Sequence, residues 1–557
     1  MKRNVDPSRN AQIDSQTSPP RVQRTTGDKV HHRGPWVATT TGAGLAAVLA
    51  GCAAIYLPGQ WMAIVVAASG ILAIAVVFQC FTRLLEICVL SDLFVRLMIH
   101  IGWSQNDPYG HPGLPVTVPL IALLILHSMA TLRRRRTSGN GFSQVDRLIG
   151  LLFLLSAASL LWASHSAPVI HGLVLLLQGV MAFLYFRRSV QQSDNVTFVV
   201  GAICGLLTFA SVVAIGQHLT GSPLIAQYLT GTTDGGEPWQ TEVGQTLVVR
   251  QVSGLSGTPN ELARALVTWL PLGVIFAFMQ STTRRMRVIA LCSVATGTTA
   301  LCLTASRGGL LTAVVTGLAG ALAYGASNSL RTCLRLHWKP GATVLAALLC
   351  AITIGTHGFV SRALTSDDGQ AASRVAMLRV AANMVAHNPI IGVGLNTYVL
   401  EMSRYDHDGI TETFYYPVHN IYMLLAGELG IVGLSLYVAI FVAFVFRAAA
   451  AFRSKHPAQA ALGFSVFLAL VAFAVDGLIE GDTLGSRTFM IFWIAGGCAS
   501  ALYQKLPPAK VLERRTLTTC QELVAQPCED SAIETTPKRS LCAPHNRQLL
   551  RTHTNTK

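Results

Sequence analysis

Long apolar stretches recur along most of the chain, separated by short segments that carry charged and turn-forming residues. A helix needs about 20 residues to cross the hydrocarbon core of a bilayer, and many of the stretches approach that length. The pattern predicts an all-α, polytopic integral membrane protein with about fourteen transmembrane helices. The predicted spans are 37–57, 61–81, 84–103, 115–132, 146–163, 168–186, 196–217, 262–280, 288–304, 308–325, 341–357, 420–446, 458–478 and 486–504.

The predicted span 84–103 differs from the others because it contains three charged residues, Glu86, Asp92 and Arg96. Charges at membrane depth are costly. A tilted or partly re-entrant helix is therefore an alternative to a full span in this segment.

Two segments between predicted spans are long, 218–261 and 358–418. Long loops in compact proteins tend to be functional. We expect the second loop to carry a short helix that Ser373 caps and that ends at His387, where an Asn-Pro pair follows. The apolar face of this helix would consist of Met377, Val380, Ala381 and Met384.

The composition excludes a soluble protein. Hydrophobic residues make up 51% of the 557 residues, charged residues only 12%, and the mean hydropathy is +0.47. A soluble surface needs more interspersed charge than this. The net charge is +15, but the basic residues recur at intervals and form no single patch, which argues against nucleic acid as a partner.

The basic residues predict how the chain crosses the membrane. From the fourth predicted span onward, every second gap is basic, as at 133–136 and 187–188. The positive-inside rule places these gaps in the cytoplasm, together with both termini. The two long loops then lie on the outer side, and the absence of cysteine from both agrees with an oxidising compartment there.

These patterns divide the chain into seven parts. They are a disordered cytoplasmic N-terminal tail (1–36), N-terminal transmembrane helices (37–217), a periplasmic loop (218–261), central transmembrane helices (262–357), a large periplasmic loop (358–418), C-terminal transmembrane helices (419–504) and a disordered basic cytoplasmic tail (505–557).

Charged residues at the outer ends of spans are the candidates for chemistry, because an ionisable group at membrane depth is functional by default. Four stand out: Arg264, Arg307, Arg374 and His419. The planar fork of an arginine suits two phosphate oxygens. Arg307 is the clearest case, since a serine precedes it and two glycines follow, so that amides at the next helix N-terminus could also approach an anion.

Each candidate also has a purely structural interpretation. Arg307 could snorkel to lipid phosphates, and His419 could be a satisfied interfacial histidine. Arg264 and Arg374 could form salt bridges instead. The possible acidic partners of these two arginines are Glu261, Asp367 and Asp368.

Two polar clusters remain. In the outer loops no metal-ligand spacing of histidines and carboxylates is found, and the cluster Asp406-His407-Asp408 reads as a solvated loop. The other cluster, near the outer end of the penultimate span, could neutralise the arginines or Arg487. It consists of Asp476, Glu480 and Asp482.

Five short motifs, in order over about 254–433, resemble the O-antigen ligase and Wzy-type polymerase family. They are Pro259-Asn260-Glu261-Leu262-Ala263, Thr304-Ala305-Ser306-Arg307-Gly308, Arg374 followed by Asn388-Pro389-Ile390-Ile391-Gly392-Val393-Gly394, His419-Asn420-Ile421-Tyr422, and Gly427-Glu428-Leu429-Gly430-Ile431-Val432-Gly433.

The resemblance implies a glycosyltransferase of the GT-C kind in the bacterial inner membrane, with its active site in the periplasm. Such an enzyme takes a glycan from undecaprenyl diphosphate and uses neither a metal nor another cofactor. By motif, Arg307 maps to the family's arginine in its Ser-Arg-Gly turn, and His419 with Asn420 to its His-Asn pair. Arg264 and Arg374 map less closely. The chain has more spans than is usual for the family, and its first third matches nothing specific.

These roles are chemically coherent. Inverting transfer needs a base for the acceptor hydroxyl, which His419 can provide at neutral pH, and neutralisation of the departing diphosphate, which the three arginines can provide. The expected function is transfer of a glycan from the lipid diphosphate carrier to an acceptor glycan or lipid core, as a ligase or as a polymerase. Other polysaccharide assembly proteins are the protein partners that such a function implies. The alternatives are a flippase or transporter of lipid-linked sugars, which would need charges in a cavity at mid-depth, and a non-catalytic subunit of an export complex.

Overall fold

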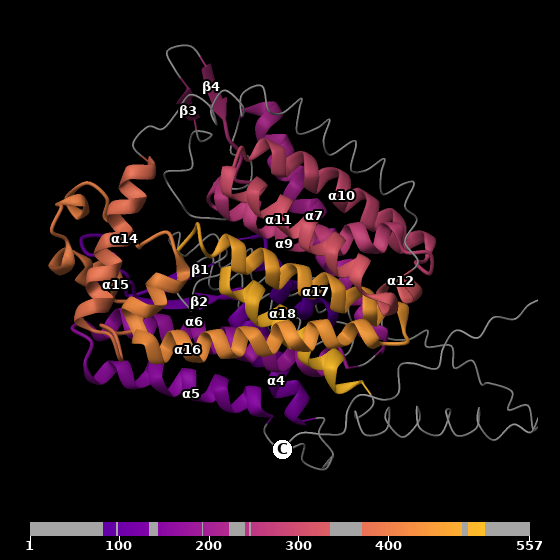
Figure 1. Ribbon diagram of the computed structural model, residues 1–557, viewed down its shortest axis with the longest axis horizontal. Coiled ribbons are helices and arrows are strands. Elements are labelled where there is room, and N and C mark those ends of the chain that lie inside the picture. The colour runs from indigo at the N-terminus through magenta and orange to yellow at the C-terminus, as the bar shows by residue number, and fades with distance from the viewer. Residues whose placement is uncertain are drawn as a thin grey trace, which may run out of the picture. The chain divides into compact units, whose positions relative to one another are not determined.

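The fold is an assembly of helices, seen in a computed structural model that describes residues 82–95, 98–132, 143–191, 193–221, 240–243, 247–334, 370–481 and 488–506 (Figure 1). Its helices and strands belong to one unit, residues 1–505. The elements are α3 (Thr82–Ser91), β1 (Met98–Ile101), β2 (Leu114–Thr117), α4 (Val118–Leu132), α5 (Gln144–Ala158), η1 (Ser159–Leu161), α6 (Ser166–Ser189), α7 (Ser193–Thr220), β3 (Gln240–Val243), β4 (Leu247–Arg250), α9 (Pro259–Phe278), α10 (Arg284–Leu303), α11 (Arg307–Ala326), α12 (Asn328–Leu334), α14 (Gln370–His387), α15 (Tyr398–Glu401), η3 (Met402–Tyr405), η4 (Ile410–Glu412), α16 (Ile421–Ala450), η5 (Ala451–Arg453), α17 (Pro457–Asp476) and α18 (Thr488–Gln504).

The prediction of an all-α polytopic membrane protein is confirmed. Among the described residues, eight helices are long and apolar enough to cross a membrane, namely α5 with η1, α6, α7, α9, α10, α11, α16 and α17, and two shorter apolar helices lie within α4 and α18. The strands form only two antiparallel hairpins, β1–β2 and β3–β4. The predicted spans 37–57, 61–81 and 341–357 lie outside the described residues.

The prediction of one helix over 84–103 is wrong. Helix α3 ends at Ser91, and the chain turns before it enters the β1–β2 hairpin. Two of the charged residues, Glu86 and Asp92, have polar partners inside the protein. The Asp92 carboxylate accepts a hydrogen bond from Gln178 Nε2 at 3.0 Å, and the Glu86 carboxylate accepts bonds from Arg83, Tyr185 and Ser189. These buried polar partners satisfy the two acids inside the protein.

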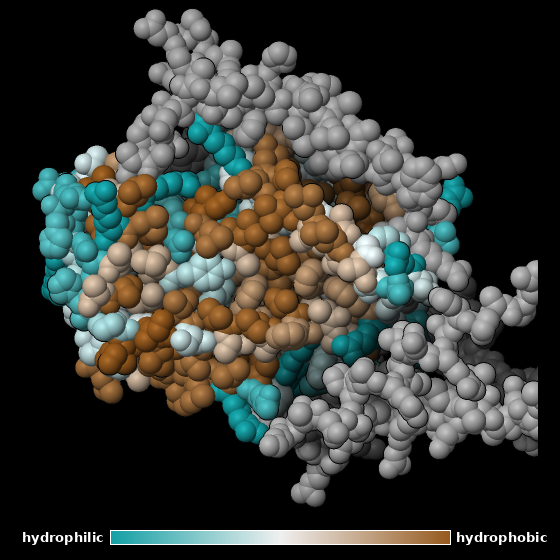
Figure 2. Space-filling view, in the orientation of Figure 1, coloured by the Kyte–Doolittle hydropathy of each residue, from teal (hydrophilic) through white to brown (hydrophobic). Residues whose placement is uncertain are grey.

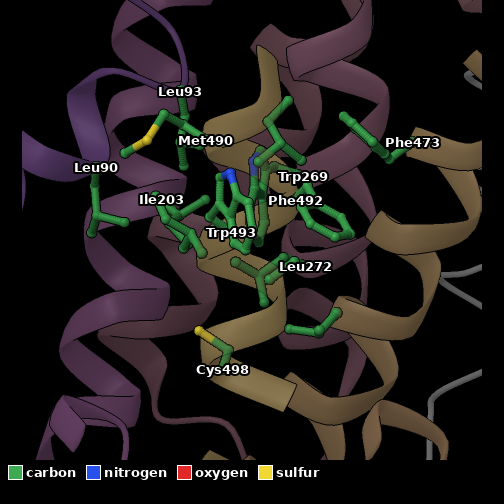
Figure 3. Close-up of a cluster of buried hydrophobic side chains, with 14 of the residues drawn as sticks. Leu90, Leu93, Ile203, Trp269, Leu272, Phe473, Met490, Phe492, Trp493 and Cys498 are labelled. Atoms are coloured by element: carbon green, nitrogen blue, oxygen red, sulfur yellow. The ribbon is translucent and has the colours of Figure 1, made fainter. Parts of the chain in front are cut away.

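Close helix packing at small residues builds the core (Figure 3). Trp493 of α18 lies beside Trp269 of α9, within a cluster to which α3, α7 and α17 also contribute. Gly179 of α6 faces the Trp493 indole so closely that a Cβ there would overlap it. Small residues let helix backbones approach in this way inside a membrane, where apolar burial alone gives little specificity.

The basic residues gather at one end of the helices. Arg187, at the end of α6, forms an ion pair with Asp146 at the start of α5. Arg447, near the end of α16, donates to Ser500 Oγ of α18 at 2.8 Å. The opposite end of α16, at residue 421, begins next to His419, so the candidate residues lie at the other end of these helices.

Helix α16 is interrupted at Gly430, where φ is +65° and ψ is −172°. The backbone groups that the interruption frees are hydrogen-bonded to the loop that follows α14. Ile431 N–H donates to the Pro389 carbonyl at 2.8 Å, and the Gly427 and Glu428 carbonyls accept from the amides of 393 and 394 at 3.0 and 2.8 Å. Unpaired backbone groups are expensive in a membrane setting, so this exchange fixes the loop to the helix.

Helix α14 carries the apolar face that the sequence predicts. Met377, Val380, Ala381 and Met384 are all buried, in a second cluster with Tyr398 and Leu424. The helix ends at His387, as expected before the Asn-Pro pair. It begins at Gln370, so the prediction that Ser373 caps it is wrong.

The surface divides by polarity (Figure 2). Hydrophobic residues cover the face over α16 and α17, and hydrophilic residues gather over α14 and α15. An apolar band beside a polar end is what a bilayer-embedded protein needs, since lipid tails cannot solvate charge.

We predict that Gly430→Ala destabilises the fold. A Cβ at this position would overlap the Ile390 carbonyl, and a positive φ disfavours any side chain, so the expected loss in free energy of unfolding is about 2–5 kcal/mol. Chemical unfolding of the protein in detergent measures it. Gly317→Ala in α11 is the control, because nothing lies within 4 Å of its Cβ position and alanine favours a helix. Equal stability of the two variants would contradict the role of Gly430.

Candidate functional site

Four of the predicted site residues lie close together at one end of the helices, around the end of α17 and the segment that follows it. They are Arg264, Arg374, His419 and Asn420. This segment, residues 477–481, approaches the chain just before α16 very closely. A Cβ at Gly481 would overlap the Val418 carbonyl, and Ile421 N–H donates to the Gly477 carbonyl at 2.8 Å. Backbone contact therefore sets the distance between the acidic segment and His419.

Glu480 is the centre of the cluster. Its Oε2 lies 3.4 Å from His419 Nδ1, and its Oε1 accepts a hydrogen bond from Asn260 Nδ2 at 2.9 Å. Arg374 Nη2 is 3.8 Å from the same Oε1, and Arg374 Nη1 donates to the Ile479 carbonyl at 3.3 Å. One carboxylate thus joins residues from α9, α14 and the start of α16.

The electrostatic balance favours an ionised Glu480. Burial penalises the charged carboxylate, but the hydrogen bond with His419 and the positive charge of Arg264 and Arg374 outweigh that penalty and lower the pKa of Glu480 below its ordinary value of 4.5. A lowered folded-state pKa means that the ionised cluster stabilises the fold above pH 4.5. This stabilisation is lost as the pH falls through the folded-state pKa.

Arg264 is buried, with 4% of its surface exposed, and it forms an ion pair with Asp476 at the end of α17. The salt-bridge interpretation is therefore confirmed for Arg264, although Asp476 is the partner here. Asp367 and Asp368, suggested as partners, lie outside the described residues. The Arg264–Asp476 ion pair joins α9 to the end of α17, beside Glu480.

Arg307 lies at the first position of α11 and is exposed. The turn before it is tight, with a positive φ of 49° at Ala305. Ser306 caps the helix by accepting from the Gly309 amide at 3.2 Å, and its hydroxyl donates to Asn260 Oδ1 at 2.9 Å. Asn260 therefore connects the Arg307 turn to Glu480.

Asn420 caps α16. Its Oδ1 accepts from the Met423 amide at 2.9 Å, and its Nδ2 donates to the Leu478 carbonyl at 3.3 Å. Both ends of the amide are thus engaged by the protein. The side chain holds the turn that carries His419 against the acidic segment.

Asn260 has no sequence signal as a site residue, whereas Glu480 and Asp476 belong to an acidic cluster that the sequence does show. The acidic cluster at the outer end of the penultimate span was the available signal. Asp482 and Arg487, from the same stretch, lie outside the described residues. The cluster Asp406-His407-Asp408 is a local turn, in which the Asp406 carboxylate accepts from Thr411 and from the Asp408 amide.

Residues 288–438 match the family model described as O-antigen ligase. The chain carries an O-antigen ligase family domain. The resemblance inferred from the motifs is thereby confirmed. A comparison with curated proteins finds no match.

The matched O-antigen ligase region contains most of α10, all of α11 and α14 and α16 up to residue 438, and with them Arg307, Arg374 and the His419-Asn420 pair. Asn260, Arg264, Asp476 and Glu480 lie outside it. The residues that hold the cluster together therefore come from elements on both sides of the matched region.

We predict that Asp476→Asn destabilises the protein strongly, because it removes the carboxylate charge that is paired with the buried Arg264. Loss of one member of a buried pair costs about 3–5 kcal/mol. Asp408→Asn is the matched control: its partner Arg379 is 69% exposed, and an exposed pair contributes below about 1 kcal/mol. Unfolding in detergent compares the two, and a small effect for Asp476→Asn would show that the pair is not held as described.

Proposed function

We propose that this protein transfers a glycan from undecaprenyl diphosphate to an acceptor glycan, as an O-antigen ligase or as a polysaccharide polymerase. The reaction would take place on the periplasmic side of the bacterial inner membrane. The observation that supports this most is the Glu480 cluster, which sets a histidine against a buried carboxylate beside arginines, at the helix ends opposite the basic residues. The positive-inside rule assigns those basic ends to the cytoplasm.

In the proposed mechanism, His419 is the general base. If Nδ1 carries the proton and donates a hydrogen bond to Glu480, Nε2 keeps the lone pair that can accept a proton. The acceptor hydroxyl oxygen attacks the anomeric carbon while its proton passes to Nε2. The bond from that carbon to the phosphate oxygen breaks, and the configuration inverts. Glu480 acts as a positioning residue, which fixes the tautomer and the orientation of the ring.

The departing lipid diphosphate gains negative charge in the transition state, and positive groups must stabilise it there. Arg307 is placed for this role, because it is exposed and the first amides of α11 lie beside it. Arg374, 39% exposed, can reach the same anion from α14. Arg264 contributes as part of the buried pair, through its charge near Glu480.

This arrangement favours transfer chemistry over a flippase. A flippase needs a charged path at mid-depth, whereas the arginines and His419 gather at the ends of their helices. Two buried acids near the start of the described residues, Glu86 in α3 and Asp92 just after it, are engaged by neighbouring side chains.

We predict that the purified protein converts a lipid diphosphate glycan and an acceptor into transferred product, read by mass spectrometry. A ladder of repeats identifies a polymerase, and a single capped acceptor identifies a ligase.

His419→Ala should slow turnover by about 10² to 10⁴ fold while donor binding stays intact, which is the usual contribution of a general base. Arg307→Lys should instead weaken donor binding, because an ammonium cannot make a two-pronged contact. If donor affinity collapses in His419→Ala while bound donor turns over normally, the base assignment is wrong.

We predict a distinct signature for Glu480. In Glu480→Gln the maximal rate should fall while donor binding stays intact, because the ring loses the carboxylate that orients it. The difference in free energy of unfolding between the wild type and Glu480→Gln should shrink as the pH falls through the lowered pKa of Glu480, where the wild-type carboxylate loses its charge. Unchanged turnover in Glu480→Gln would remove Glu480 from the mechanism.

A further inference from the structure

A second site lies where the loop after α14 meets the end of α5. A cavity of about 410 Å³ is lined by Trp162 and Ser164, by residues 388–393, and by Glu401, Arg404 and Tyr405. Its volume falls in the range of small-ligand sites, about 300–1,000 Å³. None of its lining residues belongs to the Glu480 cluster, and the mechanism above uses none of them.

The walls of the cavity are held in place before any ligand arrives. Hydrogen bonds to the interrupted helix α16 fix the loop 389–394. Asn388 Nδ2 donates to the Tyr405 hydroxyl at 2.7 Å, and Leu395 N–H donates to Ser159 Oγ at the end of α5 at 3.2 Å. A preformed site loses little entropy when it binds.

The polar groups of the cavity include both hydrogen-bond donors and acceptors, and its charged side chains are one acid and one base. Glu401, 3% exposed, accepts from Ser164 and from Arg404 Nη1, the latter at 2.5 Å. Arg404 is 65% exposed and has donors left for a ligand. Within the described residues the indole Nε1 of Trp162 is buried without a hydrogen-bond partner. One negative and one positive side chain, with hydroxyl, amide and indole groups, suit a neutral polyhydroxylated ligand better than a diphosphate.

Aromatic rings complete this chemistry. Trp162 and Tyr405 both line the cavity, and each combines an apolar face with a polar tip. A sugar ring presents apolar C–H faces between hydroxyl edges. Planar carboxylate, guanidinium and amide groups can satisfy those edges while the rings cover the faces.

The position of the cavity indicates which part of a substrate it would hold. Asn388 follows Arg374 by fourteen residues, almost all in α14, so at 1.5 Å per residue the cavity lies roughly 21 Å along that helix from the Glu480 cluster. That is too far for the sugar at which bonds change. It is within reach of a sugar further along the same glycan.

We propose that this cavity is a subsite for a sugar of the glycan chain, remote from the reacting diphosphate. The inference rests on the proposed function and deepens it. The sugar can belong to the donor glycan or to the acceptor glycan, since both present the same chemistry. In either case the subsite would make the protein discriminate between glycans by their length.

The direct test is binding, without catalysis. The full-length protein in detergent is titrated with oligosaccharides released by mild acid from the lipid-linked glycans of its own host. The wild type and the slow variant His419→Ala should both bind. Arg404→Ala should weaken binding about tenfold or more, the loss expected for one charged hydrogen bond, and Trp162→Ala should weaken it because the aromatic face against the sugar is lost. Arg379→Ala, which removes an exposed arginine from the neighbouring helix α14, should bind like the wild type. Absence of wild-type binding, or normal binding by Arg404→Ala, overturns the subsite.

The kinetic arm assigns the source of the sugar. With a donor that carries a single sugar and an acceptor of one sugar, Arg404→Ala should transfer as fast as the wild type. A raised KM with a long donor assigns the subsite to the donor glycan, and a raised KM with a long acceptor assigns it to the acceptor. An equal loss with every substrate length, with unfolding unchanged, contradicts the subsite. Loss of oligosaccharide binding in Arg404→Ala would support the subsite even if no transfer were detected, so the two proposals can fail separately.

Discussion

The interruption of helix α16 at Gly430 is the constraint on which the rest of the structure depends. A helix break inside an apolar bundle frees amides and carbonyls that no solvent can satisfy. Here the backbone at 389–394 takes them up, which ties the α14 loop to the first third of α16. The part of α16 before Gly430 leads back to His419, and the bonded loop lines the cavity. One backbone exchange thus fixes both the candidate site and the proposed subsite.

Buried acidic side chains balance part of the positive charge of the arginines at the candidate site. Asp476 neutralises Arg264 inside the protein, so the exposed cationic surface is left to Arg307 and Arg374. Glu480 then sits among positive groups that keep it ionised and hold its hydrogen bond to His419. An anion that approaches this end meets the side chains of Arg307 and Arg374, with Asp476 buried and Glu480 largely buried behind them.

Local patterns predicted the helices well wherever periodicity alone decided them. The buried face of α14 and its end at His387 follow directly from apolar spacing and from the Asn-Pro pair. The segment 84–103 failed because hydropathy could not reveal that Gln178 would hold Asp92 and let the chain turn into a hairpin. The start of α14 was missed since the capping rule is local, whereas the helix extends beyond the serine.

The sequence by itself determined the membrane class, the helix faces and the motifs of the O-antigen ligase family, because each of these is written in residues that are close along the chain. It also named the arginines and His419 as candidates. Only the tertiary structure decided which of them meet. Asn260 and Glu480 are 220 residues apart, and the Ser164–Glu401 bond that closes the cavity joins residues 237 apart. Such contacts depend on how distant helices pack, and no local periodicity encodes that packing.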